Sequence, residues 1–418
     1  MMVACAPHSE SEPFAAPEPE PLQIVEDHER VDYWSTGQRL GANTFNETPP
    51  DQAHFDSWAD YGGEWIRLSW SKWDSASGKQ FLIGDASNYS GLVQEDLDVL
   101  RDVVTLAENA DVKLVLVPLS LPGLLWSQHN DGELDDRLYQ DKAYWDQAAR
   151  FWTDMATAFR DSDTVVAYNI INEPAPERSA GHESGTRQEN RDWYDTQARG
   201  TARDLPAFYE HIIKAIRSVD PNTPIMVDGG FFGTTNGFDY FDSALSDEGV
   251  LYAHHMAKPW AATSVRNVRN GMTLSYPGEM EIWGRKQVWD AARLERELQV
   301  PVDWARESGV DPSRVVMSEF GCHRYLSWCG QYMEDVLSAA DTDGLHWAVY
   351  AFRSDNWGGR DFELGTNPPN PRDHGVSSQE FWELSEVNQL SKVKRVETPA
   401  FRVISKRLAA KRDADASP

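Results

Sequence analysis

The sequence has no uninterrupted apolar run of about eighteen residues, the length that a helix needs to cross a bilayer, so we expect no transmembrane segment. Basic residues are also scarce: 39 Lys and Arg stand against 67 Asp and Glu, which gives a formal net charge of -28. Nucleic-acid binding takes most of its affinity from Lys and Arg contacts to phosphate, so this charge excludes a nucleic-acid partner. The surplus of carboxylates favours solubility and would suit a saline or secreted setting.

Cysteine is scarce as well, with 3 residues in 418. Cys322 and Cys329 are close in sequence, and they either form a disulfide in an oxidising compartment or remain two packed thiols. The Val-Ala-Cys motif ending at Cys5 resembles the end of a bacterial lipoprotein signal, although an incidental Cys in a disordered tail remains the alternative. We expect residues 1–30 to be a disordered Pro/Glu-rich tether and the protein to be secreted, or lipid-anchored in an extracellular or periplasmic setting.

Metal-binding and phosphate-binding motifs are absent. No His-Glu-x-x-His or Cys-x-x-Cys spacing supports a zinc site among the histidines, so we predict no metal and no cofactor. The Asp-Gly-Gly segment that begins at Asp228 is interpreted as a turn, because no Lys-Ser/Thr pair follows it. No repeat of fixed period is present, which disfavours solenoids and propellers.

The rest of the chain alternates apolar β-branched runs with amphipathic segments, the pattern of βα units around a parallel sheet. We predict eight strands, at residues 41–44, 65–68, 113–119, 165–172, 224–227, 250–255, 314–319 and 346–352. Helices are predicted at residues 92–109, 142–159, 205–219, 302–308, 331–340 and 399–410. The predicted fold class is therefore α/β, a single (β/α)8 TIM barrel with extended βα loops over residues 31–412.

Two of the predicted strands end in a glutamate, and a third ends in an arginine. Glu173 follows the fourth strand, Glu319 ends the seventh, and Arg67 lies near the end of the second. Catalytic residues of TIM barrels come from these strand ends. Retaining hydrolysis of a glycosidic bond needs two carboxyl groups about 5 Å apart, one to protonate the leaving oxygen and one to attack the anomeric carbon. Each Glu alone could merely cap a helix, but the three together favour a catalytic site.

These residues carry a family resemblance. The Asn-Glu-Pro motif around Glu173, the Ser-Glu-Phe-Gly motif around Glu319 and the position of Arg67 resemble glycoside hydrolase family 5, the cellulase family, over about residues 40–408. The resemblance implies that Glu173 is the general acid/base, that Glu319 is the nucleophile, and that Arg67 keeps Glu319 ionised. It also implies that Asn172 binds the 2-hydroxyl of the sugar.

The same resemblance places His255 in the substrate cleft, but the sequence departs from the family at nearby positions. Ser120 stands near the place where the family carries a His on the third strand, and His129 is a candidate to compensate from the loop. On the sixth strand Ala257 takes the place of the Tyr that commonly contacts the nucleophile, so the orientation of Glu319 is open.

Aromatic residues are expected to line the cleft, because sugar rings stack on flat apolar faces. Tyr350 occupies the place of the Trp under the reactive sugar, with Trp347 and Phe352 as alternative alignments, and core packing is an equal alternative for Tyr350 and Trp347. Trp357, from the loop after the eighth strand, is a further candidate. We expect at least one tryptophan among these loop residues to stack on a sugar: Trp260, Trp283, Trp289 and Trp357.

Together these features predict a retaining glycoside hydrolase that acts on β-linked hexose polysaccharides or oligosaccharides. β-1,4-Glucan is the first substrate expected and β-mannan the second. A non-catalytic carbohydrate-binding barrel is the alternative, and retention of both glutamates argues against it. We expect the protein to act as a monomer.

Overall fold

The computed structural model describes residues 33–126, 130, 132–263, 274–282, 285–355, 358–366 and 395–416. Four residues considered above, Cys5, His129, Trp283 and Trp357, lie outside the described residues. The predicted tether at residues 1–30 lies outside them too, so its boundary stays a prediction.

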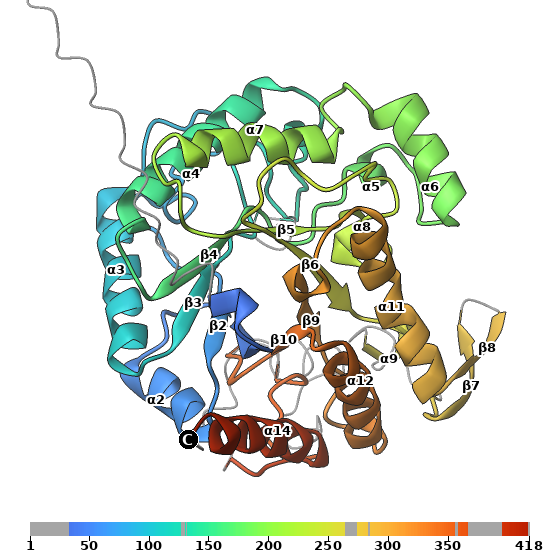
Figure 1. Ribbon diagram of the computed structural model, residues 1–418. Helices are drawn as coiled ribbons and strands as arrows, with labels where there is room; N and C mark the ends of the chain where they lie inside the picture. The colour runs from blue at the N-terminus through green and yellow to red at the C-terminus, as the bar shows by residue number, and fades with distance from the viewer. Residues whose placement is uncertain are drawn as a thin grey trace, which may run out of the picture.

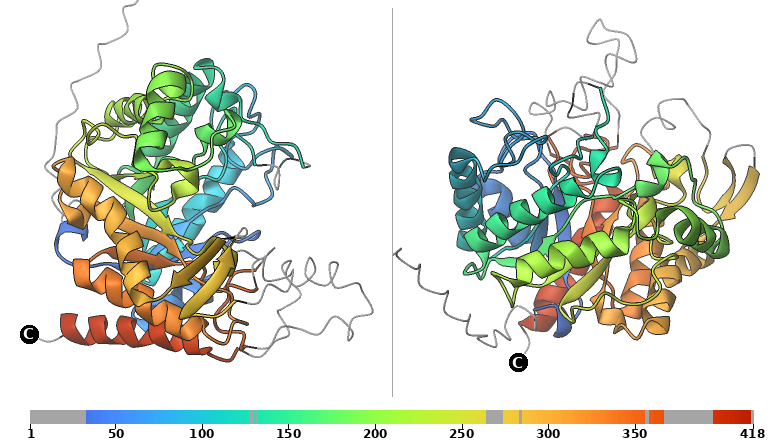
Figure 2. Two further views of the ribbon diagram at one scale, coloured as in Figure 1. Left: turned by 90° about the vertical axis from the view of Figure 1, so that its right-hand side faces the viewer. Right: turned by 90° about the horizontal axis from the view of Figure 1, so that it is seen from above.

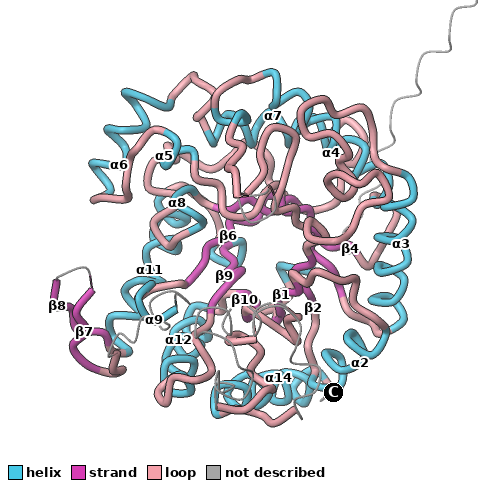
Figure 3. Tube along the Cα trace, turned by 180° about the vertical axis from the view of Figure 1, so that it is seen from behind, coloured by secondary structure: helices cyan, strands magenta, loops and turns pink. Residues whose placement is uncertain are grey.

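Eight parallel strands close into a barrel in the order β1-β10-β9-β6-β5-β4-β3-β2, with helices around the ring (Figures 1 and 3). The predicted TIM barrel is thereby confirmed. The strands are β1 (Leu40–Thr44), β2 (Trp65–Leu68), β3 (Lys113–Leu116), β4 (Val165–Asn169), β5 (Ile225–Asp228), β6 (Val250–Met256), β9 (Val315–Phe320) and β10 (His346–Val349).

Three strands end earlier than predicted. The expected ranges 113–119, 165–172 and 346–352 each run three residues past the observed ends at Leu116, Asn169 and Val349. Most of the extra residues are apolar and buried, for example Ile170 and Ile171, but they have left the sheet. Because these loop residues are buried, they are as apolar as strand residues, and the sequence pattern does not distinguish the two. Their backbone nevertheless belongs to the loops that carry the site.

Most helices lie outside the barrel, between consecutive strands (Figure 2). They are α2 (Gln52–Tyr61), α3 (Gln94–Asn109), α4 (Ala143–Phe159), α5 (Pro176–Ser179), α6 (Arg187–Trp193), α7 (Leu205–Arg217), α8 (Gly230–Gly233), α9 (Trp260–Thr263), α11 (Ala291–Glu307), α12 (Cys329–Asp343) and α14 (Pro399–Asp415). Shorter turns are η2 (Arg137–Tyr139), η3 (Tyr194–Ala198) and η4 (Pro312–Arg314). The helix predicted at 302–308 is the last part of α11, whose polar first half and internal Pro301 concealed it. No helix in the described part of the chain is long and apolar enough to span a membrane.

The loop after β6 contains an antiparallel hairpin that the sequence analysis did not predict. Its strands are β7 (Gly278–Ile282) and β8 (Arg285–Trp289), and it stands outside the barrel wall beside α11 (Figure 1). Trp289 at its end is 3% exposed, and the Arg293 guanidinium lies 5.2 Å from its ring. This tryptophan is therefore a packing residue, and the expectation of a sugar contact does not apply to it.

The barrel interior has an apolar lower part and a polar mouth. Val115, Val166, Met226, Leu251 and Val316 pack together between the strands. Trp34 closes the bottom, where its indole N–H donates to the carbonyl of Val166 at 3.0 Å.

Cys322 and Cys329 form a disulfide across the loop between β9 and α12, with Cα atoms 5.7 Å apart. Of the two alternatives left by the sequence, the disulfide is the one observed. It ties the chain just beyond Glu319 to the first residue of α12.

Candidate active site

The two glutamates meet at the mouth of the barrel. Glu319 is on β9, near its C-terminal end, and Glu173 follows β4 after a three-residue turn. One oxygen of each carboxylate and a ring nitrogen of His255 lie within 4.8 Å of one another. The separation of about 5 Å that the sequence analysis expected for a retaining pair is therefore present.

Arg67 organises the floor of this site. Its side chain is fully buried, and its Nη1 donates to Glu319 Oε1 at 2.7 Å. Nη2 donates to Asp228 at 3.0 Å and to Asn172 Oδ1 at 2.9 Å, while Nε donates to Asn169 at 2.8 Å. A guanidinium whose donors are all engaged has one orientation, so Arg67 fixes the position of Glu319.

Asp228 ends β5 and holds the other side of Arg67. Its Oδ2 also accepts the backbone N–H of Glu173 at 3.0 Å, and His255 Nε2 lies 3.4 Å away, at ion-pair distance but outside hydrogen-bond geometry. Burial acts to raise the pKa of Asp228, but Arg67, His255 and the Glu173 N–H hold it below its usual value. Asp228 is therefore an anion that links Arg67, His255 and the chain at Glu173.

The backbone of Glu173 lies in the left-handed region, with φ 49. A non-glycine residue is uncommon there and costs about 1–3 kcal/mol. The hydrogen bond to Asp228 helps to hold this conformation, which turns the side chain into the barrel mouth. Strain of this kind is concentrated at functional sites.

His255 lies between the two glutamates and is 2% exposed. Its Nδ1 is 3.0 Å from Glu173 Oε1 and 3.8 Å from Glu319 Oε2, because β6 and β9 pair His255 directly with Glu319. Burial lowers the pKa of His255, but the carboxylates of Glu319, Asp228 and Glu173 outweigh it and raise the pKa to about 10. The imidazole is therefore charged near neutral pH.

Glu319 is more enclosed than Glu173: their side chains are 15% and 35% exposed. Burial raises the pKa of Glu319, and the charges of His255 and Arg67 oppose that rise. Arg67 thus acts in the expected direction, but burial and the neighbouring Glu173 leave the net pKa above its usual value.

Asn172 reaches the site with its amide oxygen on Arg67. Among the residues that the structure describes, its amide nitrogen has no hydrogen-bond partner, so it remains available as a donor beside the two carboxylates. The expected contact with a sugar hydroxyl suits this arrangement.

Tyr350 is the one of the three alternative aromatics that borders the glutamates. Its phenol is close enough to Glu319 for that charge, together with burial, to raise its pKa. Its ring lies 5.6 Å from that of Phe45 in an edge-to-face contact. Trp347 is fully buried and packs against Phe320, and Phe352 packs against Trp58, so neither reaches the mouth.

The structure also shows the surroundings of the positions at which this sequence departs from the family pattern. Ser120 is buried after β3, and Met256 is buried in the core. Position 257 is an alanine, and the second oxygen of Glu319 faces the charged ring of His255.

Sequence reasoning missed Asp228, Asn43 and Asn169. Asn43 pairs with Arg67 across β1 and β2, and its Oδ1 accepts from Arg67 at 3.3 Å. All three residues are polar and sit at C-terminal strand ends, which is the rule that identified the glutamates. Asp228 was not predicted as a site residue, because its Asp-Gly-Gly segment was interpreted as a turn when no Lys-Ser/Thr pair followed it.

Glu173, His255 and Glu319 present three possible metal-ligand atoms. A metal would have to compete with the Arg67 guanidinium on Glu319 and with the proton on His255. Protonated imidazole is not a metal ligand, so the charges favour ion pairs here.

Comparison with known proteins places this barrel among hydrolases. The family model for cellulase (glycosyl hydrolase family 5) matches residues 30–356. A β-xylosidase of Phanerodontia chrysosporium is 24% identical over 285 residues, which cover 64% of this chain and 51% of that protein. The chain therefore spans about half the length of this curated relative.

Solved structures of endoglucanases share the fold. Cel5A of the hyperthermophilic Thermotoga maritima superposes with a TM-score of 0.56 at 15% identity, covering 86% of this chain and 99% of the other. Pseudomonas stutzeri endoglucanase Cel5A gives 0.54 at 17% identity, covering 86% and 97%. At such identities these structures support the barrel alone. The resemblance predicted from the sequence is confirmed by the family match.

Proposed function

Because the chain belongs to glycosyl hydrolase family 5, the cellulase family, we propose that it hydrolyses β-linked poly- or oligosaccharides by the retaining route, with Glu319 as nucleophile and Glu173 as general acid/base. The observation that supports this most directly is the pair of carboxylates within 4.8 Å at the barrel mouth. In the first step a Glu319 oxygen attacks the anomeric carbon while Glu173 gives its proton to the leaving oxygen. In the second step Glu173 takes a proton from a water molecule whose oxygen attacks the anomeric carbon, which breaks the bond to Glu319 and releases the sugar.

The charges of the site support this division of roles. Arg67 and His255 carry two positive charges against the carboxylates of Asp228, Glu319 and Glu173, so one added proton makes the cluster neutral. A proton on Glu319 would weaken its 2.7 Å bond to a guanidinium that cannot lose a proton. Glu173 has no guanidinium partner among the described residues, and its side chain is 35% exposed against 15% for Glu319, so it is the carboxyl group that the leaving oxygen and water can reach.

β-1,4-Glucan is the substrate we expect first. The solved neighbours described as endoglucanases support it, and the one in complex with mannotriose keeps β-mannan second. The β-xylosidase relative adds xylosides to the substrates worth testing. Reducing-sugar release from glucans, mannans and xylan distinguishes these three.

The alternative of a non-catalytic carbohydrate-binding barrel has less support. A binding site needs neither a strained Glu173 nor a fully bonded arginine fixed on Glu319. If the wild-type protein bound a polysaccharide of the panel but hydrolysed none of them, that result would favour the alternative.

Export is part of the proposal. The Cys322–Cys329 disulfide supports an oxidising compartment, because disulfides persist there and are rare in the cytosol. Fractionation of the native host, with assay of each fraction, tests this, and sedimentation of the pure protein tests the expected monomer.

Azide rescue separates the roles of the two glutamates. Glu173→Ala should still form the glycosyl-enzyme from a dinitrophenyl β-glycoside, because that leaving group needs little protonation, and azide should then give a β-azide product. Glu319→Ala leaves a cavity on the opposite sugar face, where azide should give an α-azide.

The exposed Glu183→Ala, from the loop beyond Glu173, is the matched control and should need no rescue. Opposite product configurations would reverse the two roles. Full activity in both glutamate variants would show that the pair is not catalytic.

A further inference from the structure

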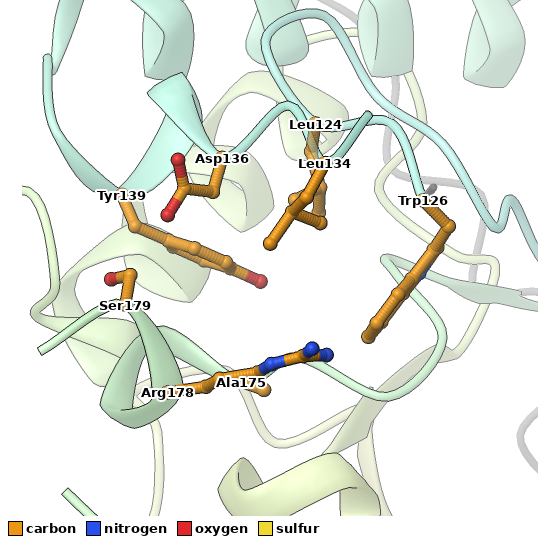
Figure 4. A pocket seen from close by; sticks show the side chains of 8 residues that line it. All are labelled: Leu124, Trp126, Leu134, Asp136, Tyr139, Ala175, Arg178 and Ser179. Atoms are coloured by element: carbon orange, nitrogen blue, oxygen red, sulfur yellow. The ribbon is translucent and has the colours of Figure 1, made fainter. Parts of the chain in front are cut away.

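A pocket lies between the loops that follow β3 and β4 (Figure 4). Leu124 and Leu134 form its apolar side, with Trp126 on one wall and Tyr139 facing it. Arg178 extends from α5 so that its guanidinium points into the space between the two aromatic rings (Figure 4). A flat aromatic wall with a polar group at its edge is a common way to bind a sugar ring.

The pocket lies on the side of the site that carries the general acid. Ala175 lines it and is two residues beyond Glu173. The Phe232 N–H donates to the carbonyl of Pro174 at 3.2 Å, and the Phe232 ring lies 5.8 Å from that of Trp126. Because Glu173 protonates the leaving oxygen, the sugar that departs must lie toward these residues. This step of the inference rests on the proposed function.

Trp126 is also continuous with the floor under the nucleophile. It packs against the buried cluster of Phe45, Val117 and Leu119, and Tyr350 packs against the same cluster. One buried apolar layer therefore supports both Tyr350, beside Glu319, and Trp126, in the pocket. A chain bound across the two glutamates would reach Trp126 with its leaving-group end.

The Arg178 guanidinium has no carboxylate partner within 4.0 Å among the described residues, and it lies 5.9 Å from the centre of the Phe232 ring. Other arginines of the described chain, such as Arg402, also lack an ion pair, but Arg178 is the arginine that lines this pocket. The contact with the Phe232 ring orients the planar group and leaves the donors at its edge free for a ligand.

We propose that Trp126, Phe232 and Arg178 form a leaving-group subsite for a sugar that carries a carboxylate, such as a uronic acid residue or substituent. Arginine offers five N–H donors and no acceptor, in a fork that fits a carboxylate in a two-point contact. A neutral hydroxyl uses only one of these donors. Asp136, which lines the same pocket and accepts a hydrogen bond from the side chain of Gln140, can accept hydrogen bonds from hydroxyl groups of the same sugar.

The long-range field of the protein makes this local cation necessary. With a net charge of -28, the chain repels an acidic substrate until a positive group compensates at close range. An unpaired arginine next to the cleft is such a group. The preference for acidic substrates should therefore depend on Arg178 more than on overall charge.

The test compares two β-1,4-linked oligosaccharides of equal length, one neutral and one with a uronic acid residue at the leaving-group end. The ratio of kcat/KM for the acidic over the neutral substrate should exceed one and fall about tenfold in Arg178→Gln, as expected for loss of one charge-assisted contact. Arg178→Lys keeps the positive charge but not the two-point guanidinium contact, so its ratio should lie between those of wild type and Arg178→Gln. Arg402→Gln on α14, on the opposite side of the barrel from α5 (Figure 1), is the matched control and should keep the wild-type ratio.

Binding separates this inference from the proposed function. In the inactive Glu319→Gln variant, calorimetry with the acidic oligosaccharide should give an affinity about tenfold weaker once Arg178→Gln is added. Equal ratios in wild type and Arg178→Gln, or an equal loss for both substrates, would overturn the acidic subsite while leaving hydrolysis intact. No hydrolysis of either substrate by wild type would instead count against the proposed function.

Discussion

Asp228 shows how one buried carboxylate controls the residues around it. It touches none of the atoms that are proposed to react, yet it binds the guanidinium that holds Glu319 and the N–H that fixes Glu173. It is fully buried, so its charge is stable only because Arg67 and His255 compensate for it. A change at this position should therefore affect stability and catalysis together.

We predict that Asp228→Asn lowers the free energy of unfolding by about 3 kcal/mol, because it leaves Arg67 buried with one counter-ion fewer. kcat should fall more than KM rises, since the variant misplaces the two glutamates. Urea unfolding and steady-state kinetics measure both effects. Asp195→Asn, which breaks an exposed ion pair with Arg199, is the control and should cost less than about 1 kcal/mol. Equal effects of the two variants would show that Asp228 has no special role.

His255 gives a pH prediction of definite sign. Its pKa is raised from 6.5 to about 10 in the folded protein, so the folded state binds its proton more tightly than the unfolded state. The stabilisation is fully present below about pH 6.5 and is lost as pH rises toward 10. Urea midpoints at several pH values should therefore fall more steeply between pH 7 and about 10 in wild type than in His255→Gln. Parallel curves would contradict the charged imidazole.

Among the secondary-structure elements, the strands and the polar residues at their C-terminal ends could be predicted from the sequence pattern. All eight strands were predicted, because a βα barrel repeats one pattern, and the two glutamates chosen from strand ends do lie together at the mouth. The sequence did not predict where β3, β4 and β10 end, because buried loop residues there are as apolar as strand residues. The β7–β8 hairpin was missed because its pairing depends on contacts with α11 that no local pattern reveals.

The turn in α8 is a second element that local rules could not give. Phe231 and Phe232 both have positive φ, 51 and 61, which bulky residues rarely adopt. Tertiary hydrogen bonds hold them: Phe231 N–H donates to buried Glu177 at 3.2 Å, and Phe232 N–H donates to Pro174. The aromatic wall of the proposed subsite therefore depends on contacts between loops that are distant in sequence.

The Cys322–Cys329 disulfide constrains the loop between β9 and α12. Closing a loop of this length in the unfolded chain is worth roughly 2–3 kcal/mol in the chain-entropy description. We predict that dithiothreitol lowers the free energy of unfolding by about 2 kcal/mol. The Cys322→Ala/Cys329→Ala double variant is the control, because it should show no response to the reductant. A wild type equally insensitive to dithiothreitol would mean that the two thiols are not bonded in solution.

At the scale of the whole molecule, the closed sheet makes the active site a property of the entire chain. β1, β2, β4, β5, β6 and β9 each contribute at least one residue to the polar mouth, so no part of the barrel could hold the site alone. Composition and pattern predicted this closure. The choice of substrate could not be predicted from them, because it depends on loop geometry around the mouth.

The domain boundary gives the last prediction. Trp34 closes the bottom of the barrel: it is 3% exposed, and its ring lies 5.2 Å from Trp65 and 5.1 Å from His346 in edge-to-face contacts. Removing residues 1–30 should therefore leave the free energy of unfolding and kcat/KM unchanged, because Trp34 and the strands it covers remain. Trp34→Ala should instead cost about 3–5 kcal/mol, since it opens a cavity under all eight strands.

Trp260→Ala, at a site that is 45% exposed, is the control and should cost less than about 1 kcal/mol. Urea unfolding of the four proteins tests the boundary directly. If removal of residues 1–30 destabilised the protein as much as Trp34→Ala, the first thirty residues would be part of the folded domain and the predicted tether would be wrong. If only Trp34→Ala did so, the folded unit would begin with the segment that closes the barrel floor, and the tail would be free to serve as a link to whatever the protein is attached to.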